Sequence, residues 1–434
     1  MKLIDIKREE WPAFFWSFAY FFFLLCAYYV LRPVRDEMGI QGGIRNLPWL
    51  ASAVFAGMLA VTPLFGWVSS RWPRRTFLPM VYLFFIANLL IFYFAMQDPA
   101  RETSIVPSAF YVWLSVFNYF VVSVFWSFMT DVFNADRAKR LFGGIAAGGS
   151  LGAIAGPVIT GTLVKQVGIP NLLLISAALL CCVIVCIVGL GSWAKKHKAP
   201  GDPRLEDQPL GGGLLDGIRL AFASPYLLTI CTYIAISQTL GQFFYIEQLR
   251  LMSEFIPSSE ERTQLFAHLD LAVNVLTLGV EVFITSALVR RLGLVFCLTL
   301  LPAIGIASLG ITGLIPALIT VSIFTVIRRS TEFAVSKPAR EILFTVVTRE
   351  ERYKAKNVID TVVSRGGDVI GSWSHAAMRG LGMGTGPMAF TVMPLAFAML
   401  ATGVYLGRAQ QKRQDALAPS SPASPATPSA SAAS

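Results

Sequence analysis

Long apolar runs separated by short polar segments fill almost the whole chain. Windows of about 20 apolar residues recur between residues 11 and 407, and each is long enough as a helix to cross about 30 Å of hydrocarbon. Their apolar residues do not alternate with polar ones, as they would in the strands of a membrane barrel. Only 14% of all residues are charged, too few for the surface of a water-soluble domain of this size. The sequence therefore predicts an all-α polytopic membrane protein.

Breaks between the apolar windows predict twelve transmembrane helices, six on each side of a polar segment. The expected spans lie near residues 11–31, 47–69, 76–96, 107–130, 141–165, 170–193, 222–246, 264–289, 293–314, 316–345, 356–379 and 385–407. The two halves resemble each other, since DRAKR (136–140) and ERYKA (351–355) each follow the fourth span of their half. Such a repeat predicts two six-helix bundles related by an axis along the membrane normal.

Four units follow from this division of the chain. We expect an N-terminal six-helix bundle at 1–193, a cytoplasmic central loop at 194–221 and a C-terminal six-helix bundle at 222–407. The last residues, 408–434, are rich in proline, alanine and serine and are expected to form a disordered cytoplasmic tail.

Basic residues gather in alternate loops between the spans. This distribution predicts that both termini face the cytoplasm, in the inner (plasma) membrane of the cell. It also explains the net charge of +10 without nucleic acid as a partner. All six cysteines lie inside apolar runs, where they are expected to pack as small core residues rather than form disulfides. We expect a monomer in contact with membrane lipid.

Charged residues inside the spans need a partner or a function, because each costs about 2.5–3.5 kcal/mol on insertion. Span ten contains Arg328, Arg329 and Glu332. Glu332 follows the arginines at i+4 and i+3, so it can pair with one of them and leave the other over. The surplus positive charge predicts an anion site. The alternative is a structural ion pair between helices, with the second arginine bonded to backbone carbonyls.

Span eleven carries a polar stripe with a period of four residues, made by Asp360, Ser364 and Asp368. This stripe must face protein or water rather than lipid. Asp368 lies near the expected midplane and is a candidate proton carrier. Arg365, three residues before it, can neutralise it, and Asp368 would then be structural.

Span eight contains Glu281, which has no charged neighbour one helical turn away. Burial would favour its protonated form, so Glu281 is our candidate coupling acid unless it pairs with a basic residue of another helix. His268 and Asp270 are expected at the interface of the same span with the outside, and His375 in span eleven is expected to be a hydrogen-bonded packing residue.

The first apolar run ends in Tyr28, Tyr29, Arg32 and Arg35. From the start of the run, Arg32 is expected at the outer boundary of the hydrocarbon. The arginines could simply mark the bilayer surface or line a positively charged vestibule. The tyrosines could stack a ring or a base, or belong to an aromatic belt at the interface.

The loop between spans two and three resembles the signature of the major facilitator superfamily. Gly66, Arg71, Arg74, Arg75 and Leu78 fit that signature, whereas its acid and its second glycine are absent. The resemblance implies a tight turn whose arginines meet helix C-termini and neighbouring acids.

Span five fits a second pattern of the superfamily, which is associated there with antiporters. The match involves Gly143, Gly152, Gly156, Pro157 and Gly161. Small residues also let helices approach closely, and a proline bends a helix, so packing alone explains the same residues.

Three segments resemble one branch of the superfamily, the ATP/ADP translocases of plastids and intracellular bacteria. These segments are YYVLRPVRDEMGI (28–40), DRAKRLFGG (136–144) and EERYKAKNVIDTVVSRGGDVIGSW (350–373). Leu31, Arg32 and Asp36 match the first motif, and Arg35 stands where the family has lysine. The resemblance implies exchange of nucleotides, and a homologue for another anion would share the motifs.

We therefore expect a secondary active transporter, either an antiporter or a proton-coupled carrier, for an organic or phosphorylated anion, with a nucleotide-like anion as the most specific version. Alternatives are an exporter of uncharged or cationic small molecules and a membrane receptor or scaffold without turnover. The sequence has no P-loop, no nucleophile–base pair and no metal-ligand cluster, so we expect neither an enzyme nor a cofactor.

Overall fold

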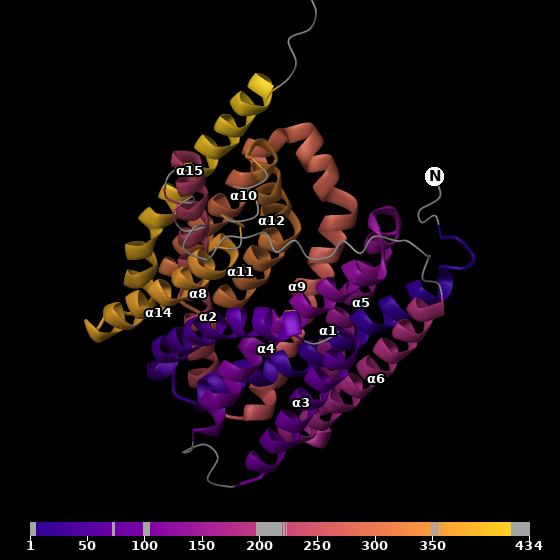
Figure 1. The fold of residues 1–434 in the computed structure, drawn as a ribbon. Coiled ribbons are helices and arrows are strands. Elements are labelled where there is room, and N and C mark those ends of the chain that lie inside the picture. The colour runs from indigo at the N-terminus through magenta and orange to yellow at the C-terminus, as the bar shows by residue number, and fades with distance from the viewer. Residues whose placement is uncertain are drawn as a thin grey trace, which may run out of the picture.

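The computed structural model describes residues 6–71, 74–98, 105–196, 224–348 and 358–417, together with single positions at 219, 222, 351, 355 and 356. Helices make up nearly all of these residues (Figure 1). In the view of Figure 1, the N-terminal helices lie mainly in the lower part of the molecule and most C-terminal helices in the upper part.

Six helices form the first half. They are α1 (Trp11–Gln41), α2 (Leu47–Arg71), α3 (Arg74–Ala95), α4 (Val106–Val132), α5 (Ala135–Val167) and α6 (Ile169–Lys196). A short 3₁₀ turn, η1 (Ile44–Asn46), joins α1 to α2. Each helix covers one of the first six expected spans.

The second half is more broken. Its helices are α8 (Pro225–Phe255), α9 (Ser259–Val280), α10 (Ser286–Leu314), α11 (Leu318–Thr331), α12 (Lys337–Leu343), α14 (Ser364–Gly380) and α15 (Thr385–Leu417). Three π-helical turns, η3 (Glu281–Thr285), η4 (Glu332–Ser336) and η6 (Ile359–Val363), join or extend these helices, and η5 (Phe344–Val346) follows α12. Gly293 has a φ of 78°, which breaks α10 within its run and separates expected span eight from span nine.

Grouped in this way, the helices within the described residues correspond to the twelve expected spans, and the predicted all-α polytopic fold is confirmed. Ten helices are long and apolar enough to cross a membrane. Spans ten and eleven fall outside these ten because charged residues and π-helical turns interrupt them. The charges that weaken the hydropathy signal are the same ones that predicted a site.

Two predicted boundaries are wrong. The first span does not end near residue 31, because α1 continues for ten more residues to Gln41. The tail does not begin at residue 408, because α15 continues to Leu417, and residues 418–434 lie outside the described part of the chain. Both helices extend past their apolar windows, since backbone hydrogen bonding does not stop where hydrophobicity does.

Two large hydrophobic cores occupy the two halves. One lies between residues 13 and 193 and the other between residues 226 and 406. A third, smaller cluster joins the halves at one end of the molecule, which we call the closed end. Its buried residues are Leu47, Leu50, Val54, Met58, Tyr111, Ile246, Leu249, Met252 and Phe266.

Candidate functional site

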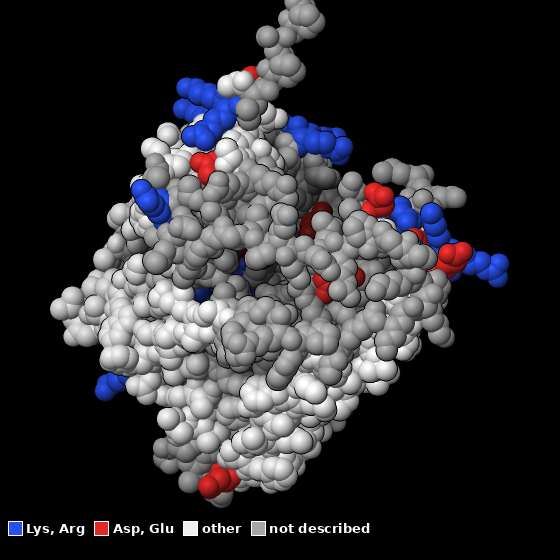
Figure 2. Space-filling view, in the orientation of Figure 1, with Lys and Arg blue, Asp and Glu red and all other residues white. Residues whose placement is uncertain are grey.

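A cavity of about 660 Å³ lies between the halves. Residues of α1, α2 and α4 line it from the first half, and residues of α8, α9, α11, α12 and α14 line it from the second. It extends from Asp36 and Tyr111, next to the closed end, to Phe344, which directly follows α12 in the chain. Figure 2 shows basic side chains recessed in a hollow near the middle of the visible face.

Two arginines from opposite halves meet one carboxylate in this cavity. Arg32 of α1 lies 3.3 Å from Asp270 Oδ1, and Arg329 of α11 donates a hydrogen bond of 2.9 Å to the same oxygen. Asp270, on α9, is 2% exposed. The three side chains therefore form a buried centre with two positive charges and one negative charge.

This centre corrects two expectations. Arg32 is not at the outer boundary of the membrane, because α1 continues past it and its side chain reaches the cavity. Asp270 is not interfacial, whereas His268, two residues earlier, is exposed. Glu332 pairs only with Arg328, whereas Arg329 pairs with Asp270 of α9, so the anion site expected from a surplus arginine stays a prediction.

Three other arginines of the cavity each pair with one acid. Arg328 donates to Glu332 at 3.1 Å, and Arg365 donates to Asp368 at 2.9 Å, as their spacings predict. Arg35 pairs with its neighbour Asp36 at 2.6 Å. These pairs carry no net charge, so they affect the shape of the cavity more than its electrostatic potential.

The described residues that line the cavity give a small positive balance. Seven are basic, namely Arg32, Arg35, Arg328, Arg329, Lys337, Arg340 and Arg365. Six are acidic, namely Asp36, Asp270, Glu332, Glu341, Asp360 and Asp368. The balance is one positive charge, and Arg32 and Arg329 contribute to it because they share the single carboxylate of Asp270.

Aromatic and amide side chains fill much of the remaining wall. The set consists of Tyr28, Tyr29, Tyr111, Tyr119, Tyr245, Phe266, Phe333, Phe344, Asn118, Gln238, Gln242 and Gln248. Tyr29 lies under the guanidinium of Arg32, with 5.6 Å from Cζ to the ring centroid. The tyrosines that we expected to stack a ring or form a belt therefore lie at the cavity, beside the charged centre. Sequence reasoning missed Gln238 and Gln242, whose only signal was a polar pair four residues apart in an apolar span.

Gly241 of α8 leaves space for an arginine side chain of span ten. A Cβ at Gly241 would lie 2.9 Å from Nη2 and 3.0 Å from Nη1 of Arg328. The guanidinium of Arg328 therefore occupies the space that a side chain would take.

The expected coupling acids lie in different environments. The stripe of Asp360, Ser364 and Asp368 faces the cavity as predicted. Glu281 is exposed and does not line it, so the burial on which its expected coupling role depended is absent. Glu281 begins the π-helical turn between α9 and α10, in which Thr285 is the buried residue.

The closed end is held by polar contacts between the halves as well as by its apolar cluster. Arg262 of α9 donates hydrogen bonds of 2.7 and 2.6 Å to the two carboxylate oxygens of Glu37 on α1. Tyr245 donates to Asp36 at 2.9 Å, and Trp373 of α14 donates to Ser52 of α2 at 3.2 Å. Sequence reasoning missed Arg262, because it lies at the start of α9 among residues that look like a loop.

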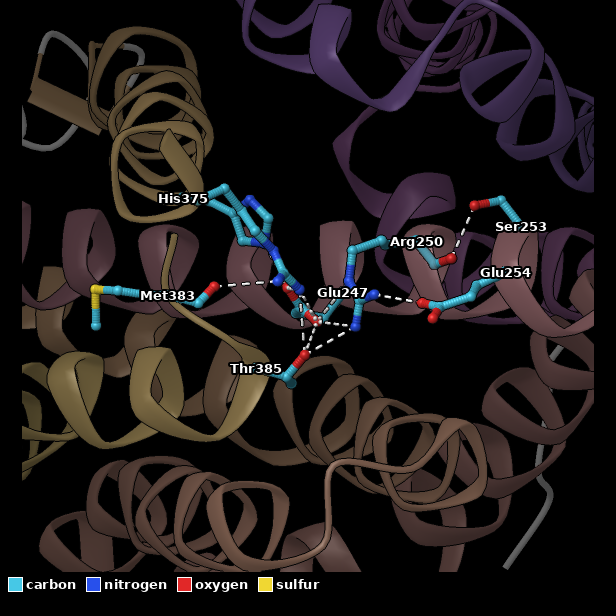
Figure 3. A network of polar contacts seen from close by, with 8 residues as sticks. Glu247, Arg250, Ser253, Glu254, His375, Met383 and Thr385 are labelled. Atoms are coloured by element: carbon cyan, nitrogen blue, oxygen red, sulfur yellow. Dashed lines mark hydrogen bonds and ion pairs between the residues drawn. The ribbon is translucent and has the colours of Figure 1, made fainter. Parts of the chain in front are cut away.

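A second buried network lies within the C-terminal half (Figure 3). Glu247 of α8 is fully buried and accepts from His375 at 2.7 Å, Thr385 at 2.7 Å and Arg379 at 3.1 Å. Arg250, one turn along α8, adds a contact of 3.2 Å. His375 is thus a hydrogen-bonded packing residue, as predicted, and the network ties α8 to α14 and α15.

The glycine pattern of span five lies against α1. A Cβ at Gly156 would meet Tyr29 Cβ at 2.6 Å, and one at Gly152 would meet the carbonyl oxygen of Phe22. Pro157 follows directly within α5. Thr160 donates to the carbonyl of Val30 at 2.8 Å across the same contact. The geometry supports close packing of α1 and α5 as the role of these residues.

The other predicted signature lies between α2 and α3. Gly66 and Arg71 belong to α2, while Arg74 and Arg75 begin α3. Their side chains, and residues 72 and 73, lie outside the described part of the structure, so the expected contacts of the arginines stay a prediction.

Comparison with known proteins decides the family. The model of the Major Facilitator Superfamily matches residues 17–334, which is most of the chain. The chain belongs to the Major Facilitator Superfamily. It is therefore a secondary transporter of a small solute and not an enzyme.

Two chlamydial proteins are distant relatives of this superfamily member. It is 23% identical to ADP,ATP carrier protein 1 of Chlamydia muridarum over 69% of this chain and 61% of that protein. It is 21% identical to ADP,ATP carrier protein 2 of Chlamydia pneumoniae over 95% of this chain and 91% of that protein. The chain thus spans less than two thirds of the first relative and most of the second.

Solved transporters share the fold. The POT family transporter PepTSo aligns with a TM-score of 0.65 at 14% identity, covering 92% of this chain and 98% of that one. The nucleoside transporter NupG aligns at 0.58 and 13%, covering 94% and 99%. An inward-facing bacterial homologue of the lysosomal transporter Spinster aligns at 0.56 and 15%, covering 94% and 97%. At these identities the likeness shows the fold alone.

Proposed function

We propose that this protein carries a phosphorylated organic anion across the membrane, with nucleotides as the most specific version of that substrate class. The observation that carries the proposal is the convergence of Arg32 and Arg329 on the single carboxylate of Asp270 inside the cavity. An anion that reaches this centre meets an uncompensated positive charge on largely buried side chains, where Coulomb attraction is stronger than in water. The names of the chlamydial relatives, ADP,ATP carrier proteins, point to the same class.

The lining next to this centre suits a substrate with a flat ring. Five tyrosines surround the arginines, and Asn118, Gln238 and Gln242 supply donors and acceptors. Aromatic side chains stack on bases without strong sequence preference, by about 1–3 kcal/mol per base. Arg32 and Arg329 would hold the phosphates, since guanidinium groups match phosphate geometry in two-pronged hydrogen bonds.

Transport would follow from rocking of the two bundles about this cavity. If the termini are cytoplasmic, as the loop charges predict, the closed end faces outward and the cavity is accessible from inside. Because Arg32 belongs to the first half and Arg329 to the second, a bound anion would contact both moving parts. We favour antiport. A bound substrate that neutralises the centre would make it easier for the two bundles to pass through the closed state than with the centre empty.

The test is uptake into proteoliposomes loaded with ADP. We expect wild-type protein to accumulate labelled ATP, and Arg32→Gln and Arg329→Gln each to lower uptake at least about tenfold, since each removes a charge-assisted contact. Arg45→Gln is the matched control, because Arg45 is exposed and does not line the cavity. Full uptake in both cavity variants, or no uptake of any phosphorylated anion by the wild type, would refute the proposal.

A further inference from the structure

Asp270 has an unusual position among the acids of the cavity. Its Oδ1 serves both Arg32 and Arg329, while its Oδ2 is buried and, within the described residues, has no hydrogen-bond partner. Arg32 Nε and Arg329 Nη2 are likewise buried without a partner. Buried polar atoms are normally satisfied, so these three atoms are available to a ligand, as are the buried Nε atoms of Arg328 and Arg365 elsewhere in the cavity.

The neighbouring pairs show what is different here. Glu332 and Asp368 each compensate one arginine of their own helix or its continuation. Asp270 instead sits on a third helix, α9, and faces arginines from α1 and α11. Ser330 of α11 also donates to the carbonyl of Val273 on α9 at 3.4 Å, which fixes α11 against α9 beside this carboxylate. This bond holds the α9 backbone in place beside the carboxylate, and within the described residues the side-chain contacts of Asp270 are those to Arg32 and Arg329.

We propose that Asp270 is a built-in counter-anion that sets the charge of the substrate which the site prefers. This inference rests on the proposed anion transport. With Asp270 ionised, the centre has a net charge of +1 and attracts an anion, but the carboxylate repels each further negative charge that the anion carries. A centre without Asp270 would have a net charge of +2 and would favour more highly charged anions.

The three groups allow this charge to be changed in steps. Asp270→Asn raises the net charge of the centre to +2, Arg329→Gln lowers it to zero, and the double variant returns it to +1. Asp270→Glu keeps the charge and tests position alone. If charge is what matters, preference should follow the net charge of the centre and not the identity of the residue that was changed.

The experiment measures binding of AMP, ADP and ATP to the purified full-length protein by competition against a labelled nucleotide. These probes share one base and one sugar and differ in phosphate charge. We expect Asp270→Asn to improve the affinity for ATP relative to AMP by about tenfold for each added charge, in line with Coulomb attraction at close range. Arg329→Gln should shift the ratio toward AMP, and the double variant should restore the wild-type order.

Glu10→Gln is the matched control. It neutralises an equally buried carboxylate that also bridges two arginines, Arg137 and Arg140, but lies outside the cavity. Its ATP-to-AMP ratio should equal that of the wild type. An equal shift in Glu10→Gln would mean that overall protein charge sets the preference, which would overturn the inference.

The outcomes separate this inference from the proposed function. If the wild type binds none of the three nucleotides, the proposed function fails and the inference fails with it. If the wild type binds them and a folded Asp270→Asn keeps the same order, only the inference fails. Should Asp270→Asn not fold, Arg329→Gln and the double variant decide, because a wild-type order in Arg329→Gln, or an altered order in the double variant, also overturns it.

Discussion

Glu37 and Arg262 join the two halves of the molecule at its closed end through two hydrogen bonds between buried charges. The carboxylate is fully buried and the guanidinium is 9% exposed. Breaking such a pair leaves an uncompensated buried charge, which costs about 3–5 kcal/mol. An energy of that size is enough to move a two-state equilibrium almost completely, so this pair is a candidate determinant of which end is open.

We expect Glu37→Gln to increase the population that is open at this end. The measurement is the labelling rate of a cysteine placed at Leu50, in the closed-end cluster, after the six native cysteines have been replaced. The rate should rise at least about tenfold. Lys165→Gln is the control, because Lys165 also pairs across the halves with Glu261, but both side chains are about half exposed and such pairs contribute little. Equal rates in Glu37→Gln and the wild type would rule out a locking role.

Gly152 should be intolerant of any side chain. Gly152→Ala would force α5 away from the backbone of α1 at Phe22, and overpacking of this kind costs about 1–3 kcal/mol. Gly143 lies on the same helix with nothing within 4 Å of a new Cβ, so Gly143→Ala should be neutral or stabilising by up to about 1 kcal/mol. Thermal unfolding of the two variants in detergent measures the difference. Similar melting temperatures would contradict the close approach of α1 and α5.

Glu247 should be essential for the stability of the C-terminal half. Glu247→Gln removes the charge that Arg250 and Arg379 share, and we expect a loss of about 3–5 kcal/mol in the free energy of unfolding. Glu254→Gln, which removes the exposed partner of Arg250, should cost less than about 1 kcal/mol. Denaturant unfolding followed by tryptophan fluorescence compares them. A loss in Glu254→Gln as large as in Glu247→Gln would show that burial does not distinguish the two acids.

Glu10, before the first span, should make the stability of the protein depend on pH. Arg140 donates two hydrogen bonds to the Glu10 carboxylate and holds its pKa below the usual value, although burial acts in the opposite direction. Because the pKa is lower in the folded state, the stabilisation is present above the unfolded pKa and is lost as the pH falls through the folded one, from about pH 4 downward.

The measurement is the melting temperature of the wild type and of Glu10→Gln across this acid range. The wild type should lose stability more steeply than the variant, and the two curves should converge at the lowest pH. Parallel curves would mean that Glu10 has the same proton affinity in the folded and unfolded states.

The fold could be predicted almost completely from the apolar windows, because hydrophobic length is what a membrane span requires. The ends of α1 and α15 could not, since hydrogen bonding carried both helices beyond their apolar windows. Pairs along one helix were also predictable, as Arg328–Glu332 and Arg365–Asp368 show, because the helical repeat fixes which side chains meet.

Contacts between helices lay beyond the sequence. Asp270 looked interfacial and Glu281 looked buried, but in the structure Asp270 is buried and Glu281 is exposed. Each depends on the rotation of its helix against its neighbours, which a single sequence does not specify. Arg262 pairs with Glu37 across more than 200 positions, and only the packing of α1 on α9 brings them together.

The π-helical turn Glu332–Ser336 lies between the arginines of α11 and the basic residues of α12. Such a turn holds one residue more than the α-helical turn it replaces, while the helix continues in phase on both sides. Deleting a single residue there would leave Lys337 and Arg340 directed as they are, whereas the same deletion inside α11 would rotate everything after it by about 100°. Relatives that differ in length by one codon at this point would therefore keep the same lining, which makes the turn a natural place for insertions to accumulate during divergence.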